Sequence, residues 1–240
     1  MKNYNTHAIV LKAINIKDSD KIYFLLSREL GKISVLGKGV RKISSRRGGN
    51  LDTLNLVEAK ITENNAGYKQ VNEVKTINSF REVKKSLDLS KLAYYMAEMI
   101  YRNVEEGMDL EDLFILFVYC LTKLAEGKRD ASEVVSFFEI RFMKILGYEL
   151  GTDFCVKCGS KIEEGMSKYV FVSDRGGFYC KNCSGFGREV TGSVFKWLKE
   201  AKTKDLMKIE KTDRSEQVNI FLKDFLGRHL ETKLKSLELI

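Results

Sequence analysis

Hydrophobic and polar positions alternate along the first 80 residues of the chain, in short runs separated by turns rich in glycine and asparagine. The runs cover residues 6–16, 21–27, 32–36, 54–63 and 67–80. Alternation of this kind is typical of strands with one buried face. Five short strands without a helical period between them predict a small Greek-key barrel, of either the oligonucleotide-binding (OB) or an SH3-like type.

The hydrophobic period changes to that of a helix after residue 80. Apolar side chains recur three and four residues apart in three stripes, over residues 92–104, 110–125 and 134–146. Stripes of this width are typical of a helix-bundle core. We expect Ser132 to cap the third helix at its N-terminus and Gly147 to end it. Two further helices are expected, over about residues 191–201 and 215–239.

Four cysteines occur as two Cys-x-x-Cys pairs with 21 residues between the pairs. Cys155 and Cys158 form the first pair, and Cys180 and Cys183 form the second. Residues 169–179 have the pattern of a hairpin, which would bring the pairs together. Four thiolates around one point are typical of a structural zinc site. We expect one zinc ion that supports folding and not catalysis, because no coordination position stays open for water.

Other interpretations of the cysteines remain open at this point. An iron site of the rubredoxin type uses the same four ligands. A redox Cys-x-x-Cys usually occurs singly beside a βαβ pattern, which the sequence lacks. The charged spacers Lys157 and Lys181 do not suit cysteines that are merely packed in a core. The fifth cysteine, Cys120, lies in the second helical stripe and is expected to be only packed.

Positive charge is concentrated at the N-terminal end of the chain. Residues 1–50 hold 11 Lys and Arg against 3 Asp and Glu, whereas residues 51–240 hold 30 of each, so the net charge of +8 comes from the first 50 residues. The densest part carries five cations among glycines and serines: Lys38, Arg41, Lys42, Arg46 and Arg47. This segment is suited to a phosphodiester backbone. The alternative is an exposed basic loop without a partner.

Several functional classes do not fit the composition. The longest apolar run, residues 113–121, has nine residues, too few to cross a bilayer, and the first residues do not form a signal peptide. We therefore expect a cytoplasmic protein with no membrane partner. The chain has two histidines and no glycine motif of the Walker or dinucleotide type. We expect no enzyme and no small-molecule substrate.

The order of these elements resembles the RecO family of bacterial recombination mediators. Residues 18–46, residues 138–148 before the first cysteine pair, and residues 225–236 carry the resemblance, with Ile43 replacing a common proline. The resemblance implies the OB form of the barrel. The expected α+β fold has four parts: residues 1–80 an OB barrel, 81–150 a helical bundle, 151–188 an inserted zinc ribbon, and 189–240 C-terminal helices that pack on the bundle.

The resemblance also implies a role in DNA repair and recombination, with single- and double-stranded DNA as ligands. Family members anneal complementary strands and help to load RecA recombinase onto DNA coated with single-stranded-DNA-binding protein (SSB). They act with RecR, and with RecF. The expected partners are thus RecR and the SSB C-terminal tail, which residues 86–147 could accept in an apolar groove, and the expected location is the nucleoid. The alternative is an RNA-binding protein of translation or transcription.

Overall fold

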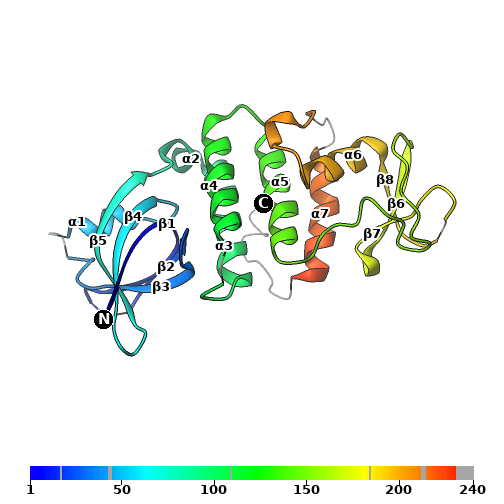
Figure 1. The fold of residues 1–240 in the computed structure, drawn as a ribbon. Coiled ribbons are helices and arrows are strands. Elements are labelled where there is room, and N and C mark those ends of the chain that lie inside the picture. Colours follow the sequence, from blue (N-terminus) through cyan, green and yellow to red (C-terminus); the bar gives the residue numbers. More distant parts are fainter. Residues whose placement is uncertain (17, 43–44, 109, 184, 212–214, 231–240) are drawn as a thin grey trace. The chain divides into compact units, whose positions relative to one another are not determined.

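A computed structural model describes residues 1–16, 18–42, 45–108, 110–183, 185–211 and 215–230. Contacts group the described chain into two compact units, and the boundary falls between Glu126 and Gly127. Figure 1 shows strands at the beginning of the chain and helices after them. The boundary lies inside residues 81–150, so the four-part division of the chain stays a prediction.

The first unit contains a closed five-stranded barrel. Its strands are β1 (Lys2–Asn15), β2 (Lys21–Ser27), β3 (Gly31–Gly37), β4 (Leu56–Glu63) and β5 (Lys69–Asn78). They pair in the order β1-β2-β3-β5-β4, and β4 pairs back onto β1. Neighbouring strands are antiparallel except β3 and β5, which are parallel and pair at Leu36 and Gln70. This order confirms the OB-like barrel that the sequence predicted.

Three helices follow the barrel strands, and the last two cover part of the barrel wall. They are α2 (Arg81–Lys85), α3 (Leu87–Asn103) and α4 (Glu111–Glu126). Ala8 and Val10 of β1 belong to the barrel core, and Ile9 and Leu11 between them are also buried. Because α3 and α4 contact β1, the strand is buried on both faces. The barrel and these helices therefore share one unit.

The second unit is built around an aromatic core. Its elements are α5 (Ala131–Ile145), β6 (Lys168–Val172), β7 (Gly177–Phe178), β8 (Arg188–Thr191), α6 (Gly192–Ala201), α7 (Ser215–His229) and two 3-10 turns, η1 (Ser173–Arg175) and η2 (Leu206–Lys208). The strands form a sheet in the order β7-β6-β8. Tyr169 of β6 stacks on Phe195 of α6 with ring centroids 3.7 Å apart, and Phe171 meets Phe221 of α7 at 4.7 Å. These contacts join the small sheet to both helices.

Most expected elements are confirmed, with some differences at their ends. Asp130, and not Ser132, caps α5, because its carboxylate accepts the Ser132 N–H at 2.8 Å. Gly147 follows α5 with a φ of +88°, a conformation that favours glycine. The last expected helix is described as far as His229, and residues 231–239 of that prediction lie outside the described residues. The helices α1 (Arg46–Asn50) and α2 and the strand β8 were not predicted.

In the part of the chain that the structure describes, no helix combines the length and the apolar composition that crossing a membrane requires.

Candidate nucleic-acid interface and metal centre

The basic segment after β3 is fixed to the barrel. The side chain of Val40 is 5% exposed and belongs to the barrel core. On either side of it, the Gly39 N–H donates to the Asp20 carboxylate at 2.8 Å, and the Arg41 N–H donates to the Ser19 carbonyl at 3.1 Å. The segment and the turn between β1 and β2 therefore form one continuous surface.

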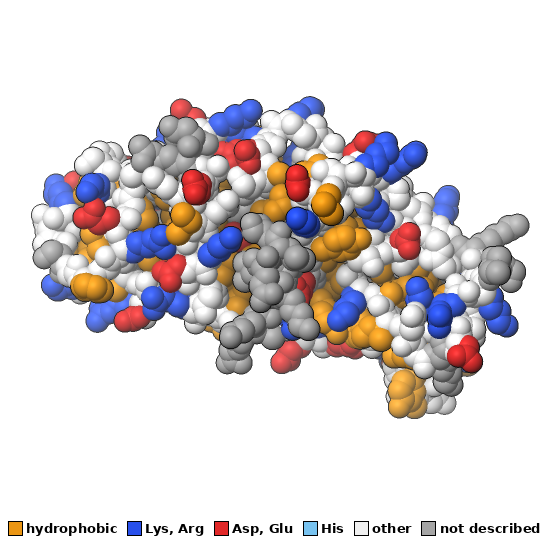
Figure 2. Space-filling view, turned by 180° about the vertical axis from the view of Figure 1, so that it is seen from behind, with side chains coloured by type: hydrophobic (Ala, Val, Ile, Leu, Met, Phe, Trp, Pro, Cys, Tyr) orange, Lys and Arg blue, Asp and Glu red, His pale blue; other side chains and the backbone are white. Residues whose placement is uncertain are grey.

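The predicted DNA-binding cations differ in how far solvent reaches them. Lys38, Arg41 and Lys42 are exposed, and all three lie on the part of the segment anchored by Val40. The side chain of Arg46 lies outside the described residues, as do Ile43 and Ser44. Figure 2 shows Lys and Arg side chains scattered among acidic ones over the drawn face, so surface charge alone does not mark a site.

Arg47 has a different role, because backbone groups occupy its guanidinium. It donates to the carbonyl of Lys38 at 3.0 Å and to the carbonyl of Val71 on β5 at 3.2 Å, with a longer contact to Asn72 at 3.5 Å. These bonds hold α1 and the basic segment against β5. Charged donors of this kind stabilise a fold more than neutral ones do. Arg47 is therefore a brace for the segment.

Two concave surfaces meet at Lys38. The first, of about 640 Å³, lies on the basic segment and includes Ser19, Asp20, Lys42 and Arg47. The second is a groove of about 510 Å³ on the outer face of β3 and β5. Lys38 lines both, so the basic segment continues into the groove.

Tyr68 lines the groove and was not singled out by sequence reasoning. Its aromatic ring suggested a strand position in the run 67–80. The structure places it in the turn before β5, where its side chain is 75% exposed. The preceding Asn64-Asn-Ala-Gly67 was the only available signal, because such a run is typical of a turn.

The first cysteine pair lies on a tight turn closed by backbone hydrogen bonds. The Cys155 N–H donates to the Ser160 carbonyl at 2.8 Å, and the Gly159 N–H donates to the Cys155 carbonyl at 2.9 Å. Gly159 has a φ of +73°, which the turn requires and glycine allows. The Lys157 N–H points at the Cys155 Sγ at 3.4 Å, as expected for a sulfur that carries negative charge.

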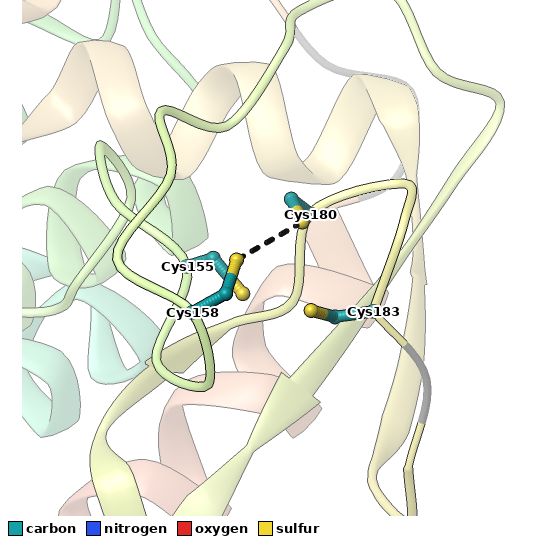
Figure 3. A group of neighbouring side chains, drawn as sticks. All are labelled: Cys155, Cys158, Cys180 and Cys183. Carbon is teal, nitrogen blue, oxygen red and sulfur yellow. Dashed lines mark hydrogen bonds between the residues drawn. The ribbon is translucent and has the colours of Figure 1, made fainter.

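The expected hairpin brings the second pair to the first. β6 and β7 pair across η1, and the Val156 N–H donates to the Phe178 carbonyl of β7 at 3.1 Å. The four sulfur atoms point toward one another in Figure 3 and lie within 4.8 Å of one another. The Sγ atoms of Cys158 and Cys180 are 3.7 Å apart. All four predicted ligands therefore come together at one point.

The chemistry of this cluster fits a bound cation. Burial raises the pKa of Cys155, but hydrogen bonds from the backbone outweigh it and lower the pKa to about 6. The hydrogen bond with Cys158 raises the pKa of Cys183 to about 12. Four thiolates so close together repel one another unless a positive charge lies between them. A tetrahedral zinc site spaces its sulfur atoms by about 3.8 Å, which fits the spacing here.

A buried lysine braces the segment that leads into the first cysteine pair. Lys202, at the end of α6, is 5% exposed. Its ammonium lies 3.1 Å from the Glu149 carboxylate, 3.4 Å from the Asp153 carboxylate and 3.0 Å from the Thr152 hydroxyl. The charge is thus fully partnered, as a buried charge must be. These contacts tie the segment before the cysteine cluster to the end of α6.

Comparison with known proteins matches both parts of the chain to the same protein family. The family model "Recombination protein O N terminal" matches residues 1–80, and "Recombination protein O C terminal" matches residues 85–238. Curated relatives are described as DNA repair protein RecO. That of Desulfosudis oleivorans is 29% identical over 259 residues, covering 100% of this chain and 98% of the relative. That of Syntrophus aciditrophicus is 31% identical over 184 residues, covering 75% and 69%.

An OB-like barrel, helices and a four-cysteine cluster in this order, with these relatives, define a DNA repair protein. The chain belongs to the RecO family.

Proposed function

We propose that this protein binds single- and double-stranded DNA through Lys38, Arg41, Lys42, Arg46 and Arg47, and anneals complementary strands. The placement of Lys38, Arg41 and Lys42 carries the proposal, because they are exposed on a segment that is anchored to an OB-like barrel. Arg47 contributes mainly by holding that segment in place. Arg46 is included because of its position in the basic segment of the sequence.

Annealing requires no catalytic residue. Two strands repel each other through their phosphates, and cations that neutralise both backbones lower this barrier. Three exposed cations would give a slope of roughly −2.1 for log K against log salt on single strands, where five equal contacts would give roughly −3.5. The slope therefore reports how many of the five cations touch phosphate.

The cysteine cluster holds one zinc ion in this proposal. Four sulfur ligands leave no open position on the metal, so the ion stabilises the second unit and takes no part in chemistry. The reducing conditions in which such cysteine pairs are kept as thiols agree with a cytoplasmic protein that works at the nucleoid.

The proposed partners follow from family membership. Acting with RecR, the protein would load RecA onto DNA that SSB coats. The SSB tail is acidic and ends in hydrophobic residues, so it would dock in an apolar groove ringed by Lys or Arg. Residues 86–147 would supply that groove.

A salt titration tests the DNA site. We expect Lys42→Ala to weaken binding to all sequences about equally and to make the slope shallower by about 0.7. Lys196→Ala is a matched control, because it removes the same charge from α6 in the second unit, where Lys196 pairs with Glu210. An unchanged slope in Lys42→Ala would remove the basic segment from the site.

Annealing of complementary strands that are already coated with SSB tests the mediator role. A protein that only binds DNA would be blocked by the coat, whereas a mediator would anneal the strands. Competition between single-stranded DNA and RNA of the same sequence separates this function from the alternative, an RNA-binding protein. Preference for RNA, together with no annealing, would favour the alternative.

A further inference from the structure

The groove beside the basic segment has an apolar floor set by strand register. Ile22 of β2 pairs with Leu36 of β3, and Leu36 pairs with Gln70 of β5, so these three residues form one row across the barrel wall. All three are half-buried, while their neighbours Tyr23 and Val35 point into the core. The row therefore lies on the outer face, where it lines the groove.

The rest of this face is closed by the helices of the same unit. Phe24, two residues beyond Ile22 on β2, meets Tyr101 of α3 edge to face, with ring centroids 4.9 Å apart. Lys32 of β3 is buried and donates to the Tyr101 carbonyl at 2.8 Å. Among the described residues, the end of the β2–β3 face next to the basic segment stays open and lines the groove.

Tyr68 is held at the far end of this groove by a rigid turn. The Asn64 side chain accepts the N–H groups of Ala66 and Tyr68 at 3.0 and 2.9 Å, and the Asn64 N–H donates to the Tyr68 carbonyl at 3.0 Å. The backbone is thus fixed while the ring stays exposed. Because the backbone is already fixed, less conformational freedom is lost when a planar group stacks on the ring.

Lys38 and Tyr68 lie at opposite ends of the groove. Lys38 comes two residues after Leu36, and Tyr68 comes two residues before Gln70, the partner of Leu36. Because β3 and β5 are parallel, these two positions lie on opposite sides of the Leu36–Gln70 pair along the strand direction. A cation at one end and an aromatic ring at the other, with an apolar floor between them, suit a short stretch of unpaired nucleotides.

We propose that Tyr68 is a specificity-determining residue that selects unpaired strands by stacking on a nucleobase, while Lys38 holds a phosphate of the same strand at the other end of the groove. This inference rests on the proposed DNA site and assigns separate roles to the basic segment and to Tyr68. The basic segment contacts phosphate in single and double strands alike. In a duplex the faces of the bases are covered by their neighbours, so Tyr68 loses its contact when annealing is complete, and the product is released.

The charges around the groove agree with this ligand. Lys38 and Lys69 line it, together with one carboxylate, Glu106, which accepts a hydrogen bond from the Ser34 hydroxyl at 3.2 Å. Lys69 lies 3.9 Å from Glu63, a loose pair that phosphate could displace. The polar side chains of Gln70 and Asn72 can bond to base edges without fixing a sequence.

The test compares Tyr68→Ala with Tyr68→Phe in the full-length protein. Loss of one stacked base lowers affinity about 5- to 150-fold, so Tyr68→Ala should weaken binding of an oligo-dT single strand by that factor. Binding of a duplex should change less than about twofold, and the salt slope should stay the same because no phosphate contact is lost. Tyr68→Phe, which keeps the ring, should bind the single strand like the unchanged protein.

A fluorescent base supplies a direct readout of stacking, and unchanged duplex binding by Tyr68→Ala excludes a folding defect. An oligonucleotide with one 2-aminopurine should lose fluorescence when it binds the unchanged protein or Tyr68→Phe, and should keep it with Tyr68→Ala. If Tyr68→Ala keeps both its single-strand affinity and the quenching, the inference is wrong. That result would leave the proposed DNA site intact as long as Lys42→Ala still lowers the salt slope. If Lys42→Ala has no effect either, the DNA site itself is wrong.

Discussion

The four cysteines of the cluster lie together, whereas the five cations of the basic segment differ in their exposure and contacts. All four cysteines meet at one point, where their sulfur atoms could hold a metal ion. Among the five cations, three are exposed, Arg47 is used to brace α1 against β5, and the Arg46 side chain lies outside the described residues. The spacing of the four cysteines restricts where their side chains can lie, whereas the spacing of cations in a basic segment does not.

The difference has a physical origin. A Cys-x-x-Cys turn must present both sulfurs on one side, and two such turns joined by a hairpin must converge. An arginine can equally donate to phosphate or to the carbonyls of its own fold, because both accept from a planar fork. Its sequence position does not decide between them.

The largest expected effect removes one ligand of the cluster. Structural zinc contributes on the order of 10 kcal/mol to the folding of a small metal domain, so Cys155→Ser should lose most of the zinc and destabilise the second unit by several kcal/mol. Metal analysis and thermal unfolding measure both. The cluster and the basic segment lie in different units, and we therefore expect the salt slope of DNA binding to stay unchanged.

Cys120→Ala is the control for this substitution, since Cys120 is buried in α4 and lies outside the cluster. It should keep the full zinc content and destabilise the protein much less than Cys155→Ser does. Full zinc content and unchanged stability in Cys155→Ser would contradict the metal assignment.

A smaller effect is expected at Arg47. It distinguishes a residue that stabilises the basic segment from a residue that contacts DNA. Arg47→Ala removes charged hydrogen bonds to the part-buried carbonyl of Val71 and the exposed carbonyl of Lys38, so we expect a loss of about 1–3 kcal/mol in the free energy of unfolding. Lys42→Ala should stay within about 0.5 kcal/mol of the unchanged protein. Urea unfolding measures both. The brace assignment is wrong if Arg47→Ala keeps its stability and loses salt slope as Lys42→Ala does.

Periodicity predicted the barrel and the long helices because each strand and helix buries a regular face. It could not predict that α3 covers part of the β2–β3 surface, because this depends on the contact of Tyr101 with Phe24, 77 positions earlier in the chain. Short elements such as α1 and β8 were missed for a related reason. α1 contains Gly48 and Gly49, which are poor helix formers, and it is held by Arg47 and by close packing of Gly48 on the Val40 carbonyl.

The same limit applies to Tyr68 in the groove. An aromatic residue beside Gly67 and before a strand reads as part of that strand. The Asn64 hydrogen bonds instead keep Tyr68 in the turn that ends one residue before β5, where its side chain is exposed. Contacts made by side chains with a distant backbone thus decide which of several equivalent residues becomes functional.

The smallest expected effect is a difference in pH dependence between the stability that Lys202 contributes and the stability that Arg47 contributes. Partial burial raises the pKa of Glu149 and of Asp153, but Lys202 outweighs this and lowers both below their ordinary values. A carboxylate with a lowered pKa stabilises the folded form above about pH 4 and loses this contribution as the pH falls through its folded-state pKa. The carbonyls bound by Arg47 do not titrate, so the deficit of Arg47→Ala should be the same at pH 6 and pH 4.

Lys202→Met should therefore raise the pKa of both carboxyl groups in a carbon-13 titration, and its stability deficit should shrink below pH 4. Both side chains are about half exposed, and Lys144 and Lys199 also pair with them, so the pH-dependent part should stay below about 1 kcal/mol. Lys196→Met on the same helix is the control and should raise only the pKa of Glu210. Unchanged titration of Asp153 and Glu149 in Lys202→Met would show that the cysteine segment, like the basic one, is held by contacts that do not respond to pH.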